Sequence, residues 1–270
     1  GGNLDLEGNK FTDSGGDVTI QSGSSSDLVF NTGGTDRTLR LGPPTTDNGG
    51  TDIAGGNVVA GHQNNAVKDG AKGVVISGGG STSFDPSNVV YDDYGTIGGG
   101  DRNKAGDSGG DATSAEYATV GGGYLNFATG EKAFVGGGDT NEAAGVESAV
   151  CGGQGNDAKK EASFVGGGTQ NLADGIEATV SGGSYNEATG KKAFVGSGEE
   201  NKAAGVEATV SGGSSNEATG NRATIGGGQN NSAGKHATVA GGGVNDATGE
   251  YSIVAGGYQN FAKGDYSFAA

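Results

Sequence analysis

The chain has 270 residues, of which 61 are glycine and only 31% are hydrophobic, so one large globular core is excluded. Three prolines without a Gly-X-Y period exclude collagen. A formal net charge of −16 and the lack of any run of about 18 apolar residues argue against nucleic-acid binding and membrane insertion. We interpret the opening Gly1-Gly2 and the absence of methionine as marks of a segment of a longer protein.

Residues 1–56 contain short stretches in which apolar and polar side chains alternate. NLDLEGNKFTD, GDVTIQS, SDLVFNT and RTLRLG are examples, and Gly, Ser, Asn and Asp separate them. This pattern is typical of short β-strands joined by turns. We therefore expect a short-strand, fibre-like β region over residues 1–56.

A unit of 15 residues repeats through residues 57–270. Numbered from the Ala of ATV, regular units begin at Ala118, Ala133, Ser148, Ser163, Ala178, Ala193, Ala208, Ala223, Ala237 and Ser252, and a partial unit begins at Ser267. Looser copies begin at Asn57, Val74 and Gly95, with insertions between residues 80 and 117. Fifteen residues suit two short strands and two turns, so the sequence predicts an all-β fold, a parallel β-solenoid with one unit per turn.

Several positions of the unit predict how the turns stack. In the regular units position 1 is Ala or Ser and position 3 is Val or Ile, and both face the same way on a strand. We expect Val120, Val135, Val180 and Val210 to form one interior column. Position 9 is Asn, which tolerates the left-handed backbone region and whose amide can hydrogen-bond along a stack. The glycines at positions 5, 6 and 13 are expected to supply φ > 0 at the turns.

Two outward positions alternate from one unit to the next. Position 2 carries Phe134, Phe164 and Phe194, with Thr or Ala between them. An apolar stripe outside the core marks an interface, so we expect these phenylalanines to contact other copies of the chain, against the alternative of simple solvent exposure. Position 15 alternates in charge, as in Glu177 and Lys192, so that stacked side chains attract each other.

Units such as ATVSGGSYNEATG and ATIGGGQNNSAG resemble the head repeats of YadA-like trimeric autotransporter adhesins. The resemblance covers residues 57–270 and implies a left-handed parallel β-roll, a homotrimer and binding to host surfaces. Residues 1–56 are similar to the trimeric fibre shafts of tailed viruses, and repeats of this type also occur in virion fibres. The resemblance thus implies an extracellular attachment protein, on a virion or a cell surface.

The insertions carry the candidate binding residues. NVVYDDYG places Tyr91 and Tyr94 around Asp92 and Asp93, and exposed tyrosines beside carboxylates suit carbohydrate or protein binding. Local packing of the two tyrosines is the alternative.

The stretch DRNKAGDSGGD carries three further aspartates, Asp101, Asp107 and Asp111, on an inserted loop. Carboxylates there can hold Ca²⁺, the one cofactor that we consider, and a solvated acidic loop is the alternative. Because surface insertions cost little, deletion of residues 107–116 is expected to leave thermal stability nearly unchanged.

The sequence shows no catalytic constellation. His62 and His236 lie in different registers of the repeat, with His236 expected at the surface, and Cys151 lies at position 4 among small residues. We expect a non-enzymatic attachment protein whose partners are its own copies and a host-surface glycan or protein. Two alternatives stay open: a structural filament or coat subunit, and a glycan-cutting tailspike with paired carboxylates. An ice-binding surface needs a regular Thr array, and Phe interrupts the Thr residues of position 2. Acidic residues at position 10, such as Glu142 and Glu187, belong to the regular array.

Overall fold

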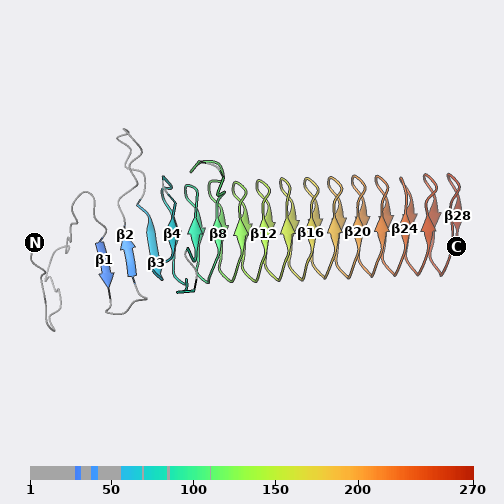
Figure 1. Cartoon of the computed structure of the whole chain (residues 1–270). Coiled ribbons are helices and arrows are strands. Elements are labelled where there is room, and N and C mark those ends of the chain that lie inside the picture. Colours follow the sequence, from blue (N-terminus) through green and yellow to red (C-terminus); the bar gives the residue numbers. More distant parts are fainter. Residues whose placement is uncertain (1–27, 32–37, 42–55, 69, 84–85, 110) are drawn as a thin grey trace, which may run out of the picture.

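The computed structural model describes residues 28–31, 38–41, 56–68, 70–83, 86–109 and 111–270. Its regular elements are all β-strands, with no helix among the described residues. Figure 1 shows a straight rod in which similar turns follow one another in chain order, from β3 to β28. The all-β parallel solenoid predicted over residues 57–270 is confirmed.

Two sheets run along the rod, and a typical turn contributes one strand to each of them. The strands β1, β2 and β3 have four residues, and the later strands have two. The first sheet contains β1 (Leu28–Asn31), β2 (Thr38–Leu41), β3 (Val58–Gly61), β5 (Val75–Ile76), β7 (Thr96–Ile97), β9 (Thr119–Val120), β11 (Phe134–Val135), β13 (Ala149–Val150), β15 (Phe164–Val165), β17 (Thr179–Val180), β19 (Phe194–Val195), β21 (Thr209–Val210), β23 (Thr224–Ile225), β25 (Thr238–Val239), β27 (Ile253–Val254) and β28 (Phe268–Ala269). The second contains β4 (Ala66–Val67), β6 (Val89–Val90), β8 (Lys104–Ala105), β10 (Phe127–Ala128), β12 (Glu142–Ala143), β14 (Asp157–Ala158), β16 (Leu172–Ala173), β18 (Glu187–Ala188), β20 (Lys202–Ala203), β22 (Glu217–Ala218), β24 (Ser232–Ala233) and β26 (Asp246–Ala247).

The strands pair in parallel with the same position of the next turn. Val135 lies opposite Val150, for example, and Ala143 lies opposite Ala158. At the start of the rod, β1 pairs with β2 and β2 with β3, both antiparallel. The strands β1 and β2 fall within the predicted SDLVFNT and RTLRLG stretches. The other two strands predicted in residues 1–56 lie outside the described residues.

The interior of the rod is a thin column of small apolar side chains. Val120, Val135, Val180 and Val210 are all 0% exposed and belong to one cluster, as the sequence predicts. The alanines of positions 1 and 11 complete this cluster. Each turn therefore buries little apolar area of its own, and the stacking of turns depends strongly on hydrogen bonds.

A ladder of buried asparagines supplies many of these hydrogen bonds. Nδ2 of Asn186 donates to Oδ1 of Asn171 at 3.1 Å and to the backbone oxygens of Gly182 and Gly198 at 3.0 and 2.8 Å. Oδ1 of Asn186 in turn accepts from the backbone N–H and Nδ2 of Asn201. The hydrogen bonding expected of position 9 is confirmed, and its asparagines are not the residues that adopt the left-handed region.

The predicted φ > 0 is confirmed for the glycines of position 6 and for several of position 5, such as Gly167 (φ +142°), and is wrong for those of position 13. Gly183, at position 6, has a φ of +92° as expected, whereas Gly190, at position 13, lies outside the left-handed region. A Cβ on Gly190 would lie 2.0 Å from the backbone oxygen of Gly205, so Gly190 has no room for a side chain, although the turn that begins at Ser148 has Lys160 at position 13. The left-handed residues that are not glycine occupy positions 8 and 15, as in Tyr185 (φ 56°) and Lys192 (φ 58°).

Candidate functional site

The outer face of the first sheet carries the phenylalanine stripe. Phe134, Phe164 and Phe194 are 41%, 36% and 38% exposed in the single chain, so their outward orientation is as predicted. Val146 and Ile176, at position 14 of the Phe-bearing units, are exposed as well.

The alternation at position 2 is matched in part by a second alternation at position 4. A Cβ placed on Gly166 would lie 3.5 Å from Cε1 of Phe164, and the same holds for Gly196 and Phe194. The atoms that leave no room there are the backbone oxygens of Ser181 and Ser211 in the next turn, which would lie 2.3 and 2.2 Å from these Cβ atoms, whereas the ring is at ordinary contact distance. The turns between the Phe-bearing ones have Cys151, Ser181 or Ser211 at position 4, but Gly121 and Gly226 accompany Thr119 and Thr224.

Position 15 forms a ladder of charges and rings along one edge of the rod. Oε2 of Glu177 lies 3.6 Å from Nζ of Lys192, and Oε2 of Glu207 lies 2.8 Å from Nε of Arg222, which confirms the predicted pairing. These pairs lie at the surface, where water and salt screen the attraction, so each contributes little to stability. Further along, the predicted surface residue His236 is half-buried and stacks on Tyr251 with a ring separation of 4.7 Å.

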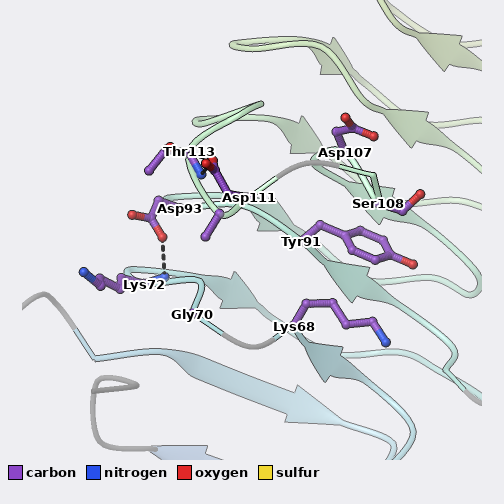
Figure 2. Close-up of a pocket in the computed structure, with 10 residues that line it drawn as sticks. Lys68, Gly70, Lys72, Tyr91, Asp93, Asp107, Ser108, Asp111 and Thr113 are labelled. Atoms are coloured by element: carbon purple, nitrogen blue, oxygen red, sulfur yellow. Dashed lines mark hydrogen bonds between the residues drawn. The ribbon is translucent and has the colours of Figure 1, made fainter. Parts of the chain in front are cut away.

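The insertion before Ala118 closes a pocket on the edge of the second sheet. Its volume is about 760 Å³, and its lining comprises Lys68, Gly70, Lys72, Tyr91, Asp93, Asp107, Ser108, Asp111, Ala112 and Thr113. Tyr91 follows β6 and Lys68 follows β4, and Nζ of Lys68 lies 5.8 Å from the centre of the Tyr91 ring. Figure 2 shows these two side chains extending in the same direction beneath the segment that bears Asp107 and Ser108.

The sequence places four adjacent residues in a binding site, and the structure separates them. Tyr91 and Asp93 line the pocket, and Oδ1 of Asp93 accepts a 2.8 Å hydrogen bond from the backbone N–H of Lys72 (Figure 2). Tyr94 is not part of the lining and stacks on Tyr117, with 4.9 Å between the ring centres.

Asp92 is fully buried, so its predicted role as an exposed binding residue is wrong. Its Oδ2 accepts a hydrogen bond from the backbone N–H of Asp107, and its Oδ1 accepts one from Oγ of Ser114 at 3.2 Å. Asp92 therefore fastens the inserted loop to the solenoid. The pocket also includes Lys68, Lys72 and Thr113; the two lysines lie in the first turn and Thr113 in the inserted loop, and no motif in the sequence links them.

The three aspartates proposed as calcium ligands are not brought together. Asp107 and Asp111 line the pocket, whereas Asp101 lies outside it and forms a parallel bridge with Tyr124. No group of three or more His, Cys, Asp or Glu side chains suited to a metal ion occurs in the part of the chain that the structure describes. The Asp111 carboxylate has local hydrogen-bond partners instead. Thr113 donates to its Oδ1 from both Oγ1 and the backbone N–H, which lowers the pKa of the Asp111 carboxyl.

The acidic residues of position 10 behave as an array. Glu142 and Asp157 are neighbours on β12 and β14, and partial burial, followed by the charge of Asp157, raises the pKa of Glu142. Neither residue lines the pocket. Glu187 forms an ion pair with Lys202 at 3.0 Å. The pocket and this array therefore remain separate features of the second sheet.

Deletion of residues 107–116 is expected to lower the melting temperature, contrary to the expectation from the sequence. The deletion removes Ala115, which is buried, and both donors to the buried carboxylate of Asp92. A buried carboxylate without donors costs about 3 kcal/mol. Thermal unfolding followed by circular dichroism measures the effect, with Asp111→Ser as a control that keeps the loop length. An unchanged melting temperature in the deletion variant would show that the loop does not support the scaffold.

The fold defines this chain as a repeat protein of the parallel β-solenoid class. No family model matches the sequence, and a comparison with curated proteins finds no match. Among the described residues, no helix has the length and apolar character needed to cross a membrane.

Proposed function

We propose that the chain is a non-enzymatic, extracellular attachment protein that acts as a parallel homotrimeric rod. The observation that carries this proposal is the exposed stripe of Phe134, Phe164 and Phe194 on a coil whose own interior is thin. Successive phenylalanines are two turns apart, about 10 Å at the spacing of parallel strands. Parallel copies repeat one contact at every second turn, and each Phe buried there contributes about 2 kcal/mol.

A trimeric rod suits attachment because it displays three copies of every loop. Weak contacts with a surface then gain avidity without any new contact in the chain. The resemblance of the repeats to YadA-like adhesin heads supports both the trimer and the host-surface role. A virion fibre and a cell-surface adhesin both meet this description, and a structural filament differs from them in having no receptor.

The assembly is tested with Phe164→Asp. The wild-type protein is expected to have three times the 26.1 kDa mass of one chain in light scattering after size exclusion, whereas Phe164→Asp is expected to give monomers or aggregates. Tyr185→Asp is the matched control, because Tyr185 is also an exposed aromatic residue (52%) but lies at position 8, away from the stripe. A Phe164→Asp trimer of unchanged stability means that the stripe is not the interface.

A further inference from the structure

The pocket lies where insertions interrupt the regular turns. In the regular units the outward position 12, just after each strand of the second sheet, holds Thr, Ala, Lys, Asp or Gly. At the equivalent place in the first two turns the chain has Lys68 and Tyr91. Backbone hydrogen bonds from Lys68 to Val90 and from Tyr91 to Ala105 keep these residues in register with the ladder. A flat aromatic ring is thus held on a rigid scaffold, with a loop next to it.

Most residues that line the pocket carry a polar group, and Gly70 and Ala112 are the exceptions. The lining combines the carboxylates of Asp93, Asp107 and Asp111 with two ammonium groups and the hydroxyls of Ser108 and Thr113. Pockets for apolar ligands are lined mainly by aliphatic and aromatic side chains, whereas this lining has one aromatic side chain, Tyr91, and no large aliphatic one. One ring surrounded by many hydrogen-bonding groups suits a ligand that has a C–H face and many hydroxyls.

The loop carboxylates are oriented and able to accept further hydrogen bonds. Oδ1 of Asp107 accepts from the N–H of Gly109 at 3.0 Å, and Oδ1 of Asp111 accepts from Thr113. Among the hydrogen bonds of the described residues, Oδ2 of both aspartates is unused, so each can accept a hydroxyl group of a ligand.

The charge of the pocket selects among hydroxyl-rich ligands. Three carboxylates against two ammonium groups leave a local charge of about −1 at neutral pH. The chain as a whole carries −16. Sulfated or sialylated chains are therefore repelled at long range and meet carboxylates at short range. A neutral sugar is subject neither to the long-range repulsion nor to the short-range contact between like charges.

We infer that this pocket binds a neutral saccharide, with a sugar ring against Tyr91 and hydroxyls donated to Asp107 and Asp111. The inference deepens the proposed attachment function and rests on it. Nζ of Lys68 lies over one face of the same ring, 5.8 Å from its centre, and is a further donor to the sugar hydroxyls. A trimer presents three such pockets, so the affinity of each one does not need to be high.

The test uses the full-length chain on an array of neutral, sialylated and sulfated oligosaccharides together with intact and periodate-oxidised glycoproteins. The wild-type protein is expected to bind neutral oligosaccharides and to lose its glycoprotein targets after oxidation. Tyr91→Ala is expected to weaken this binding about tenfold or more, as truncation of a central aromatic anchor does. Tyr91→Phe keeps the ring and is expected to bind like the wild type. Tyr185→Ala controls for the loss of an exposed tyrosine elsewhere, and melting curves verify the fold of each variant.

The outcomes distinguish a failure of the saccharide-pocket inference from a failure of the proposed attachment function. Neutral-sugar binding that is lost in Tyr91→Ala and retained in Tyr91→Phe and Tyr185→Ala supports the inference. Binding to anionic oligosaccharides alone overturns it, as does an equal loss in Tyr91→Ala and Tyr185→Ala. If the wild type still binds glycoproteins after oxidation, and Tyr91→Ala binds them equally well, the attachment function stands and the pocket is not the binding site. If the wild-type trimer binds nothing on the array, both proposals fail.

Discussion

Gly183→Ala is expected to destabilise the rod by about 3 kcal/mol or more, because it combines backbone strain with a steric clash. Gly183 has a φ of +92°, and a Cβ there would lie 2.1 Å from the backbone oxygen of Gly198 and 2.6 Å from Nδ2 of Asn186. The same Gly198 oxygen accepts hydrogen bonds from Ser184 N–H and from Asn186, so a shift of the chain breaks both. Thermal unfolding and limited proteolysis near this turn measure the effect.

The preceding glycine provides the control for this prediction. Gly182 lies outside the left-handed region, and its Cβ would meet only the oxygen of Gly167, at 3.9 Å. Gly182→Ala is therefore expected to change stability by less than about 0.5 kcal/mol. The chain itself has Ser197 at this position in the next turn. Equal melting temperatures for the two alanine variants would contradict the account of position 6.

Asn186→Ala is the second substitution with a large expected effect. The Asn186 side chain, which is fully buried, makes five hydrogen bonds: two to Asn201, one to Asn171 and two to backbone oxygens. Alanine leaves the N–H of Asn201 and several other buried groups without this partner, at about 1–3 kcal/mol for each group that finds no replacement. We expect a loss of about 3 kcal/mol in the free energy of unfolding, measured by chemical denaturation.

An exposed asparagine tests whether burial and the ladder cause this loss. Oδ1 of Asn221 accepts one hydrogen bond, from the N–H of Val206, at the surface. Asn221→Ala is expected to cost less than about 1 kcal/mol, since water replaces a single exposed bond. If Asn186→Ala is as mild as Asn221→Ala, the ladder does not hold the turns together. In a solenoid the damage is also expected to stay local, because each turn contacts only its neighbours.

The sequence alone determined the stacking of the regular turns. The period of 15 residues equals one turn, so every residue lies beside its own equivalent in the next turn. A pattern in the sequence is then already a pattern of tertiary contacts, which is why the valine column, the asparagine ladder and the Glu207–Arg222 pair are predictable. The outward orientation of Phe164 follows from the same register.

Only the tertiary structure decided features that depend on close approach or on the insertions. The lack of room for a side chain at Gly190 arises from its distance to the backbone of Gly205 in the next turn, and residue preferences do not encode this distance. The left-handed conformation of Lys192 is imposed by the stack, with its N–H bound to Ile176 of the preceding turn. The burial of Asp92 and the assembly of the pocket depend on how an aperiodic loop folds back on the rod, where the repeat no longer determines which residues meet.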